Sequence, residues 1–339
     1  MYQKIKKRKR YRSVFSIHVN SLLSDCHYIV KRAGVYTDLR GVPDRYNGGY
    51  MMSGIKLIAT DMDGTLLDSE RRIPKKNAEA IRYAESKGVT VAVATGRDFT
   101  EAVVPLKEVG IRLPLICVNG AEIRQKDGDI YSQVTMSRSL YRRAADILRD
   151  EGVYYEIYTG KGSYTEDEQK GLQIVADIML STGEFESYDQ VMRVAEARFK
   201  EGAVTVTEDY DQILNQGVSL LKLLAFSKDG SKREKAAERL RKLGSIAVSA
   251  SASENLEITH VHATKGQALE QVAQNMGIPM NQTAAIGDNF NDLSMLKAAG
   301  TGIAMANAAD EVKAVSCYIT GANTEAGVAE AIYRMIDGN

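Results

Sequence analysis

The stretch that decides the fold is residues 55–66, IKLIATDMDGTL. Its first half, residues 55–60, is a short apolar run that predicts a buried parallel strand, and residues 89–95 form a second run of this kind. Between the two runs, residues 73–87 carry apolar side chains at helical spacing, with Pro74 near the start. The segment therefore predicts a strand–helix–strand unit with parallel strands.

The same alternation continues along the chain on both sides of a long middle segment. Further strands are expected at 115–118, 283–286, 302–305 and 318–320, and further helices at 100–109, 265–276, 290–299, 308–316 and 324–336. Strands that alternate with helices predict an α/β fold whose core is a Rossmann-like, doubly wound parallel sheet.

The middle segment has a different pattern, with long polar stretches between amphipathic helices. It predicts a second, smaller α/β unit that is inserted into the first. We therefore expect four parts in the chain. They are a basic N-terminal extension that is disordered or non-native (1–51), the first part of the core (52–134), the inserted unit (135–255) and the second part of the core (256–339).

The composition places the chain among globular proteins. Of its 339 residues, 44% are hydrophobic and 26% are charged, which is enough apolar material for a large core. No apolar run reaches the roughly 18 to 20 residues of a membrane-spanning helix, so we expect no membrane partner. The three cysteines, Cys26, Cys117 and Cys317, do not form a disulfide framework, which favours a cytoplasmic protein.

The charge is distributed unevenly along the chain. Residues 1–50 contain 11 Lys and Arg against 3 Asp and Glu, whereas the remaining residues contain 33 against 41. An acidic body repels phosphate backbones, so we expect no nucleic-acid partner for it. Two interpretations of the basic extension remain. It is either translated upstream sequence, with native synthesis starting at Met51 or Met52, or a basic tail that docks on nucleic acid or anionic lipid.

Acidic side chains follow two of the predicted core strands at the point where each strand ends. Asp61 and Asp63 come directly after the first strand, and Asp288 and Asp292 follow the strand at 283–286. Ligands of parallel sheets bind beyond the carboxyl ends of the strands, so we expect these carboxylates to meet at one edge. Carboxylates at this density repel one another, and Mg²⁺ is a hard cation that suits oxygen ligands and phosphate. The sequence therefore predicts a magnesium site.

These residues resemble the motifs of a known enzyme family. Residues 61–65, DMDGT, resemble the first motif of the haloacid dehalogenase-like (HAD) phosphatases, and Thr95 in the turn ATGR resembles the second. Lys265 in TKG resembles the third motif, and residues 287–292, GDNFND, resemble the fourth. The form of the fourth motif, residues 118–121 (VNGA) and the large insert between the second and third motifs are similar to Cof-type, subfamily IIB hydrolases.

The resemblance implies a mechanism with an aspartyl-phosphate intermediate. Asp61 would attack phosphorus, and Asp63 would protonate the leaving oxygen and then activate water. Mg²⁺ would be held by Asp61, the main-chain carbonyl of Asp63 and Asp288. The expected phosphate ligands are the amides of Met62 and Gly96 and the side chains of Thr95, Lys265 and Asn291.

Four further residues have secondary places in this scheme. Asp292 would hold Lys265 or metal-bound water, and Asn289 would be an outer-sphere metal ligand. Asn119 and Gly120 form either a plain turn or part of the substrate entrance, as their family counterparts suggest.

The inserted unit would fold over the strand ends as a cap that excludes water and selects the leaving group. Four tyrosines near its start either pack inside its sheet or form a stacking surface for the leaving group. They are Tyr154, Tyr155, Tyr158 and Tyr164. His260 and His262 alternate just before Lys265 and are expected to be structural, because no Cys or third His completes a metal site.

Over residues 55–338, the resemblance implies a Mg²⁺-dependent, cytoplasmic phosphatase whose partner is a small phosphorylated metabolite. Sugar phosphates, flavin mononucleotide (FMN), pyridoxal phosphate (PLP) and the phosphorylated pyrimidine of riboflavin synthesis all suit the family. Two alternatives remain: a sugar phosphotransferase or phosphomutase, and a catalytically vestigial regulatory binding protein. The intact catalytic set argues against the vestigial protein. We expect a monomer or a weak homodimer.

Overall fold

The computed structural model describes residues 54–181, 187–189, 191–193, 196, 204–250 and 254–338 of the chain. The N-terminal extension predicted over residues 1–51 lies outside these residues, and so do both interpretations of it. Across the described part of the chain, no helix is both long enough and apolar enough to span a bilayer.

Eight strands of the described residues form the larger sheet, in the spatial order β14-β13-β12-β1-β2-β3-β4-β5. They are β1 (Leu57–Thr60), β2 (Thr90–Ala94), β3 (Leu115–Cys117), β4 (Glu122–Arg124), β5 (Ile130–Gln133), β12 (Thr283–Gly287), β13 (Thr301–Ala304) and β14 (Tyr318–Ile319). From β14 to β3 all neighbours are parallel, whereas β4 and β5 are antiparallel. The chain runs outward from β1 in both directions, which confirms the predicted α/β fold with a parallel-sheet core.

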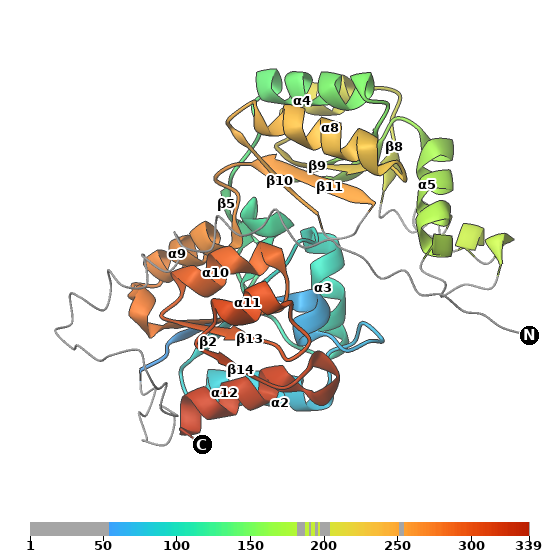
Figure 1. Cartoon of the computed structure of the whole chain (residues 1–339). Helices are drawn as coiled ribbons and strands as arrows, with labels where there is room; N and C mark the ends of the chain where they lie inside the picture. Colours follow the sequence, from blue (N-terminus) through green and yellow to red (C-terminus); the bar gives the residue numbers. More distant parts are fainter. Residues whose placement is uncertain are drawn as a thin grey trace, which may run out of the picture. The chain divides into compact units, whose positions relative to one another are not determined.

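Helices cover both faces of this sheet (Figure 1). They are α2 (Lys75–Ser86), α3 (Phe99–Glu108), α9 (Lys265–Asn275), α10 (Leu293–Ala298), α11 (Asp310–Ala314) and α12 (Gly327–Asp337). On one face α2 packs against α12, and on the other α9 packs against α10. Their apolar side chains share one core with β1, β2 and β12. Because both faces are covered, β1 is buried along its whole length and its residues do not alternate between apolar and polar.

Six strands of the described residues form a second sheet, in the order β10-β11-β9-β6-β7-β8. They are β6 (Tyr154–Thr159), β7 (Gly162–Thr165), β8 (Thr205–Val206), β9 (Leu220–Phe226), β10 (Ile246–Ser249) and β11 (Asn255–His260). The helices of this unit are α4 (Arg138–Asp150), α5 (Glu168–Ser181), α7 (Tyr210–Asn215) and α8 (Gly230–Arg241). Helices α4 and α8 cover one face of the sheet (Figure 1), and a separate apolar core lies between them and residues such as Ile157 and Leu223.

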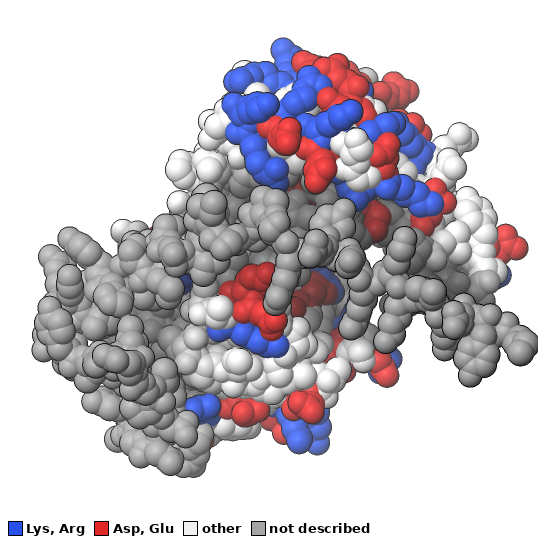
Figure 2. All heavy atoms as spheres, in the orientation of Figure 1, with Lys and Arg blue, Asp and Glu red and all other residues white. Residues whose placement is uncertain are grey.

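The outer surface of α4 and α8 carries charges of both signs, which Figure 2 shows interspersed over these helices. Arg239 of α8 lies 2.8 Å from Asp150 and 2.7 Å from Glu151 at the end of α4. Exposed ion pairs of this kind contribute little to stability, so the buried apolar faces of α4 and α8 are what hold the two helices on the sheet.

Three features differ from the sequence pattern. β4 and β5 form an antiparallel hairpin that the pattern does not predict, because β5 exposes Ile130 and Tyr131 together and does not alternate. β11 pairs with β9 and ends at His260, so the second sheet extends past the boundary expected at residue 255. The helix expected over 290–299 is α10 preceded by a 3₁₀ turn, because a local capping arrangement tightens its start.

Candidate active site

The side chain of Lys265 joins two carboxylates at the carboxyl end of the core sheet. Lys265 is the first residue of α9, and its Nζ lies 2.5 Å from Asp61 Oδ1 and 2.6 Å from Asp292 Oδ1. Lys265 and Asp292 are fully buried, and Asp61 is 5% exposed. Burial by itself would lower the pKa of Lys265, but the two carboxylates raise it above its usual value. The ammonium group therefore stays charged.

Asp61 emerges directly from the end of β1. Its amide donates to the carbonyl of Ile286 in β12 at 2.8 Å, which continues the parallel ladder by one residue and orients the side chain. Burial and then the nearby Asp292 raise the pKa of Asp61 well above its usual value, and Lys265 offsets only part of this. Positive charge beyond that of Lys265 would favour the ionised form of this carboxyl group.

Asp288 completes a group of three carboxylates. Thr65 Oγ1 donates a 2.6 Å hydrogen bond to Asp288 Oδ1, and one oxygen from each of Asp61, Asp288 and Asp292 lies within 4.8 Å of the other two. Burial raises the pKa of Asp288 to about 6, although the bond from Thr65 lowers it. Gly64 passes so close that an added Cβ would lie 2.5 Å from Asp288 Oδ2, and its φ of +79° also favours glycine.

The donor set of this group fits a magnesium ion. When all are ionised, the three carboxylates outweigh the single charge of Lys265, and a hard divalent cation with oxygen ligands offsets that excess. Asp292 is poorly placed to hold the ion. Its Oδ1 accepts from Lys265, and its Oδ2 accepts from the amides of Asp288 (2.9 Å) and Asn289 (3.0 Å). Asp61 and Asp288 are the carboxylates that could hold a metal.

Asp63 lies outside this group of carboxylates and pairs with Arg97. Arg97 Nε and Nη2 donate to the two oxygens of Asp63 at 2.8 and 2.5 Å, a bidentate arrangement. The Asp63 side chain is 52% exposed. Burial alone would lower the pKa of Arg97, but the contact with Asp63 raises it. This pair could not be predicted from the sequence, because no local pattern joins an arginine in the second motif to an aspartate 34 residues earlier.

Thr95 and Gly96 follow β2, which pairs in parallel with β1, so they lie at the same sheet edge as Asp61 and Met62. Thr95 is fully buried, and its Oγ1 accepts a 3.1 Å hydrogen bond from the amide of Arg97. The hydroxyl proton of Thr95 can then be donated to a ligand. Met62 begins the turn η1 (Met62–Leu66), and the first amides of such a turn have no partner within it.

Asn119 connects the second and fourth motifs. It lies in the turn η2 (Val118–Gly120) with a φ of +56°, and its amide donates to Thr95 O at 2.9 Å. Its Oδ1 accepts from Asn291 Nδ2 at 3.1 Å. Asn119 therefore contacts the backbone of one motif and the side chain of another.

Gly120 brings the same turn against the third motif. Its φ is +100°, and an added Cβ would lie 2.3 Å from the carbonyl oxygen of Thr264 and 3.1 Å from the amide of Lys265. The close approach leaves no room for a side chain. Asn119 and Gly120 therefore form a buried turn that contacts three motifs.

The two asparagines of the fourth motif have different surroundings. Asn291 Nδ2 donates one of its two hydrogens to Asn119 Oδ1. The buried Oδ1 of Asn291 has no hydrogen-bond partner within the described residues. Its second Nδ2 hydrogen suits a phosphate oxygen at this edge. Asn289 is exposed, and its Oδ1 accepts from the amide of Phe290 at 2.8 Å, where it caps the turn η4 (Phe290–Asp292). The structure thus places Asn289 at the rim of the site.

The four tyrosines of the second unit divide between the two faces of its sheet. Tyr155 and Tyr164 pack against the apolar core under α4 and α8. Tyr154 and Tyr158 alternate with them and point to the opposite face. The Tyr158 ring centre lies 4.5 Å from Lys222 Nζ. The alternation expected of packed strand residues is therefore present.

His260 and His262 lie together where β11 leads into the segment before α9. Their ring centres are 5.2 Å apart, and the amide of His262 donates to His260 Nδ1 at 3.2 Å. Among the residues that the structure describes, no acidic or sulfur ligand joins them to form a metal-binding group.

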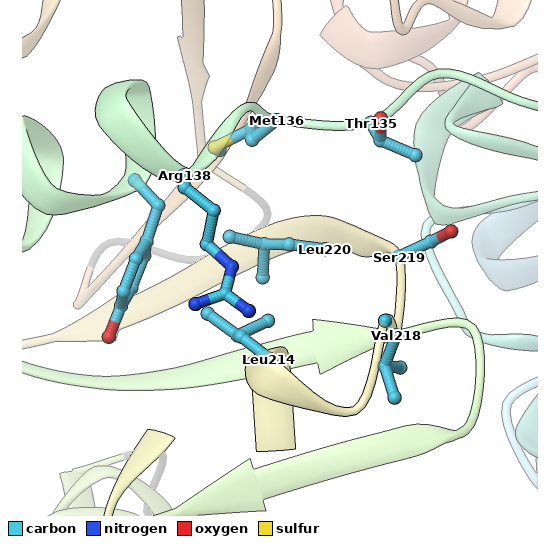
Figure 3. A pocket seen from close by; sticks show the side chains of 9 residues that line it. Thr135, Met136, Arg138, Leu214, Val218, Ser219 and Leu220 are labelled. Carbon is cyan, nitrogen blue, oxygen red and sulfur yellow. The ribbon is translucent and has the colours of Figure 1, made fainter. Parts of the chain in front are cut away.

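A pocket of about 280 Å³ lies in the second unit (Figure 3). The residues that line it come from the segment before α4 and the first turns of α4, from α7, and from the segment that leads into β9: Thr135, Met136, Arg138, Tyr141, Leu214 and residues 217–220. Figure 3 shows Arg138 extending from α4 toward Leu214. No residue predicted for catalysis lines this pocket. The candidate active site is the edge of the core sheet.

The chain is similar to known proteins of one enzyme family. A family model described as haloacid dehalogenase-like hydrolase matches residues 58–332. Phosphatase YwpJ of Bacillus subtilis is 32% identical over 288 residues, which cover 83% of this chain and 100% of that protein. The 5-amino-6-(5-phospho-D-ribitylamino)uracil phosphatase YwtE of the same organism is 34% identical over 285 residues, which cover 84% and 99%.

Among solved structures, a haloacid dehalogenase-like hydrolase from B. subtilis has a TM-score of 0.73 and 31% identity, covering 83% of this chain and 100% of that one. The family match spans most of the chain, including both segments of the core sheet. The predictions of a Cof-type HAD hydrolase and of a phosphatase enzyme are confirmed. The chain belongs to the haloacid dehalogenase-like hydrolase family.

Proposed function

We propose that the protein is a Mg²⁺-dependent phosphatase that hydrolyses small phosphomonoesters through an aspartyl-phosphate on Asp61. The observation that carries the proposal is the buried contact of Asp61 with Lys265, beside Asp288 and Asp292. A buried lysine orients the carboxylate, and the surrounding charge suits a cation and a phosphoryl group together.

In the first step, an oxygen of Asp61 forms a bond to phosphorus and the bond from phosphorus to the leaving oxygen breaks. Asp63 gives its proton to the leaving oxygen. In the second step, Asp63 takes a proton from water while the water oxygen bonds to phosphorus and the bond to Asp61 breaks. Arg97 pairs with the ionised form of Asp63, which is the form that accepts the proton from water.

The phosphoryl oxygens would be held by groups that converge on the same edge. Lys265 supplies a positive charge, and Thr95 supplies a hydroxyl donor. The amides of Met62 and Gly96 and the second Nδ2 hydrogen of Asn291 complete the donors. We refer to these five residues as the phosphate cradle.

Asp61, Asp288 and the main-chain carbonyl of Asp63 would hold the magnesium ion. When bound, the ion supplies positive charge that lets the Asp61 carboxylate approach an anionic phosphate. Asp292 holds Lys265 and the amides of the fourth motif in position, so it supports both the phosphate cradle and the metal ligands.

The substrate class that we propose is small phosphorylated metabolites. The name of the relative YwtE makes 5-amino-6-(5-phospho-D-ribitylamino)uracil the first substrate to test. Sugar phosphates, FMN and PLP are the other candidates. We further propose that the unit with the second sheet acts as a cap that excludes water and selects the leaving group.

The experiment that tests this function is hydrolysis of p-nitrophenyl phosphate by the purified protein, with Mg²⁺ and with a chelator. Turnover that needs Mg²⁺ supports the proposal. Turnover unaffected by the chelator would contradict the metal requirement, and no turnover in either condition would favour a vestigial binding protein. A panel of phosphorylated metabolites then ranks substrates by kcat/KM, and transfer of phosphate to an added sugar would identify a phosphotransferase.

A further inference from the structure

Lys222 and Glu257 form a buried ion pair on the second sheet, on the face opposite α4 and α8. Their side chains are 3% and 7% exposed, and Lys222 Nζ lies 3.7 Å from Glu257 Oε1. Lys222 is opposite Thr259 in the register of β9 and β11, so Glu257 is its diagonal neighbour. Nothing in the proposed chemistry uses either residue.

Lys222 also reaches the backbone of the second motif. Its Nζ donates to Gly96 O at 3.0 Å. This carbonyl belongs to the same planar peptide as the Arg97 amide, which donates to Thr95 Oγ1. Because one plane holds both groups, a cation that fixes the carbonyl also fixes the donor that orients the Thr95 hydroxyl.

Glu257 reaches the site through Asn119. Its Oε2 accepts a short hydrogen bond from Asn119 Nδ2. A carboxylate only accepts, so this bond determines which end of the Asn119 amide faces Glu257. The other end, Oδ1, then faces Asn291 and accepts its hydrogen bond. Two members of the phosphate cradle, Thr95 and Asn291, are therefore connected to one ion pair of the second sheet.

A buried ion is costly unless it is both paired and hydrogen-bonded. In this structure, each member of the pair has its partner and one contact to the core: Lys222 to Gly96, and Glu257 to Asn119. If the second sheet moved away from the core, both contacts would be lost together. The ion pair therefore keeps these hydrogen bonds only when the second sheet contacts the core, which is also the state in which the phosphate cradle is ordered.

We propose that Lys222 and Glu257 are positioning residues: the ion pair of the second sheet orients the Gly96–Arg97 peptide and Asn119, and so assembles the phosphate cradle. This inference rests on the proposed phosphatase function. A residue that recognises the leaving group would affect only some substrates. The positioning role predicts weaker binding of the phosphoryl group itself, whatever alcohol is attached.

The test uses orthovanadate, which mimics the phosphoryl group in the transition state of transfer and carries no leaving group. In the full-length protein with Mg²⁺, Lys222→Met and Glu257→Gln should each weaken vanadate inhibition of p-nitrophenyl phosphate hydrolysis by about 10- to 100-fold. kcat should fall by a similar factor. Lys222→Arg keeps the cation and its donors and should recover most of the vanadate affinity.

Two further variants separate positioning from general damage. Glu156→Gln is the matched control, since Glu156 is a buried carboxylate on the same sheet face that accepts from Tyr154. It should leave vanadate inhibition unchanged. The double variant Lys222→Met/Glu257→Gln removes both charges together, so it should fold even if a single variant does not. Its loss of vanadate affinity should equal that of one single variant and not the product of two, because the pair acts as a unit.

Unchanged vanadate inhibition in the double variant would overturn the proposal, even if KM for a metabolite rose, because that pattern belongs to leaving-group contacts. A loss equally large in Glu156→Gln would also overturn it. Failure of the phosphatase function itself is recognised separately, since the unmodified protein would then neither hydrolyse p-nitrophenyl phosphate nor bind vanadate.

Discussion

Lys265 donates a hydrogen bond to Asp61, which lies 204 residues earlier in the chain, and both side chains are buried. The contact exists because α9 begins where β1 ends, at the carboxyl edge of the core sheet. If Asp61 is the nucleophile that we propose, this lysine orients its carboxylate before substrate arrives.

Asp63→Asn should slow turnover by about 10² to 10⁴, the usual contribution of a positioned acid and base. p-Nitrophenolate leaves without a proton, so the first step should remain fast and the second should become slow. Stopped-flow absorbance should therefore show a burst of p-nitrophenolate stoichiometric with enzyme, followed by slow release. An unchanged kcat, or slow turnover with no burst, would remove Asp63 from the second step.

Asp288→Asn should change stability in opposite directions with and without magnesium. Without the ion, the variant should be more stable than the unmodified protein, because one of three neighbouring carboxylates no longer repels the others. With Mg²⁺ at 100 times its Kd, the free energy of unfolding of the unmodified protein should rise by about 2.7 kcal/mol, and that of the variant should rise much less.

Differential scanning fluorimetry with and without Mg²⁺ measures this difference. Asp146→Asn, at an exposed carboxylate of α4, serves as the control and should keep the full magnesium shift. If Asp288→Asn shows the same magnesium shift as the control, Asp288 is not a metal ligand.

Gly120→Ala should damage both stability and activity, because the new Cβ would collide with Thr264 O beside Lys265. Gly88→Ala is a matched control with a φ of +78° and no atom within 4 Å of its added Cβ. The free energy of unfolding of the control should fall by about 1–2 kcal/mol, because alanine is strained in the left-handed backbone conformation. Gly120→Ala should lose a further amount of about 1–3 kcal/mol from overpacking, with a lower kcat.

Urea unfolding and p-nitrophenyl phosphate kinetics of the two glycine variants provide the comparison. Equal losses of stability, together with full kcat in Gly120→Ala, would show that the η2 turn does not support Lys265.

The core strands and most of the site could be predicted from sequence because their signals are local. Asp61, Thr95 and Asp288 each follow an apolar strand, and parallel strands bring their carboxyl ends to one edge. Lys265 can be recognised only through its motif, since the local sequence pattern does not show that its side chain reaches Asp61.

Contacts between distant side chains could not be predicted in this way. Lys222 and Gly96 are 126 residues apart, and their contact depends on the register of β9 and on how the second sheet meets the core. The hairpin β4–β5 was missed for a related reason, because its exposed apolar residues do not follow the alternation of a half-buried strand.

Whether Asp61 is the nucleophile can be decided by measuring kcat of Asp61→Asn with p-nitrophenyl phosphate and Mg²⁺. An amide cannot form the acyl-phosphate, so turnover should be undetectable, while the melting temperature shows that the fold persists. Intact mass spectrometry should verify that the asparagine has not deamidated to aspartate. A verified Asp61→Asn protein that keeps more than about 1% of the original kcat would contradict the assignment, since loss of a covalent nucleophile costs far more than that.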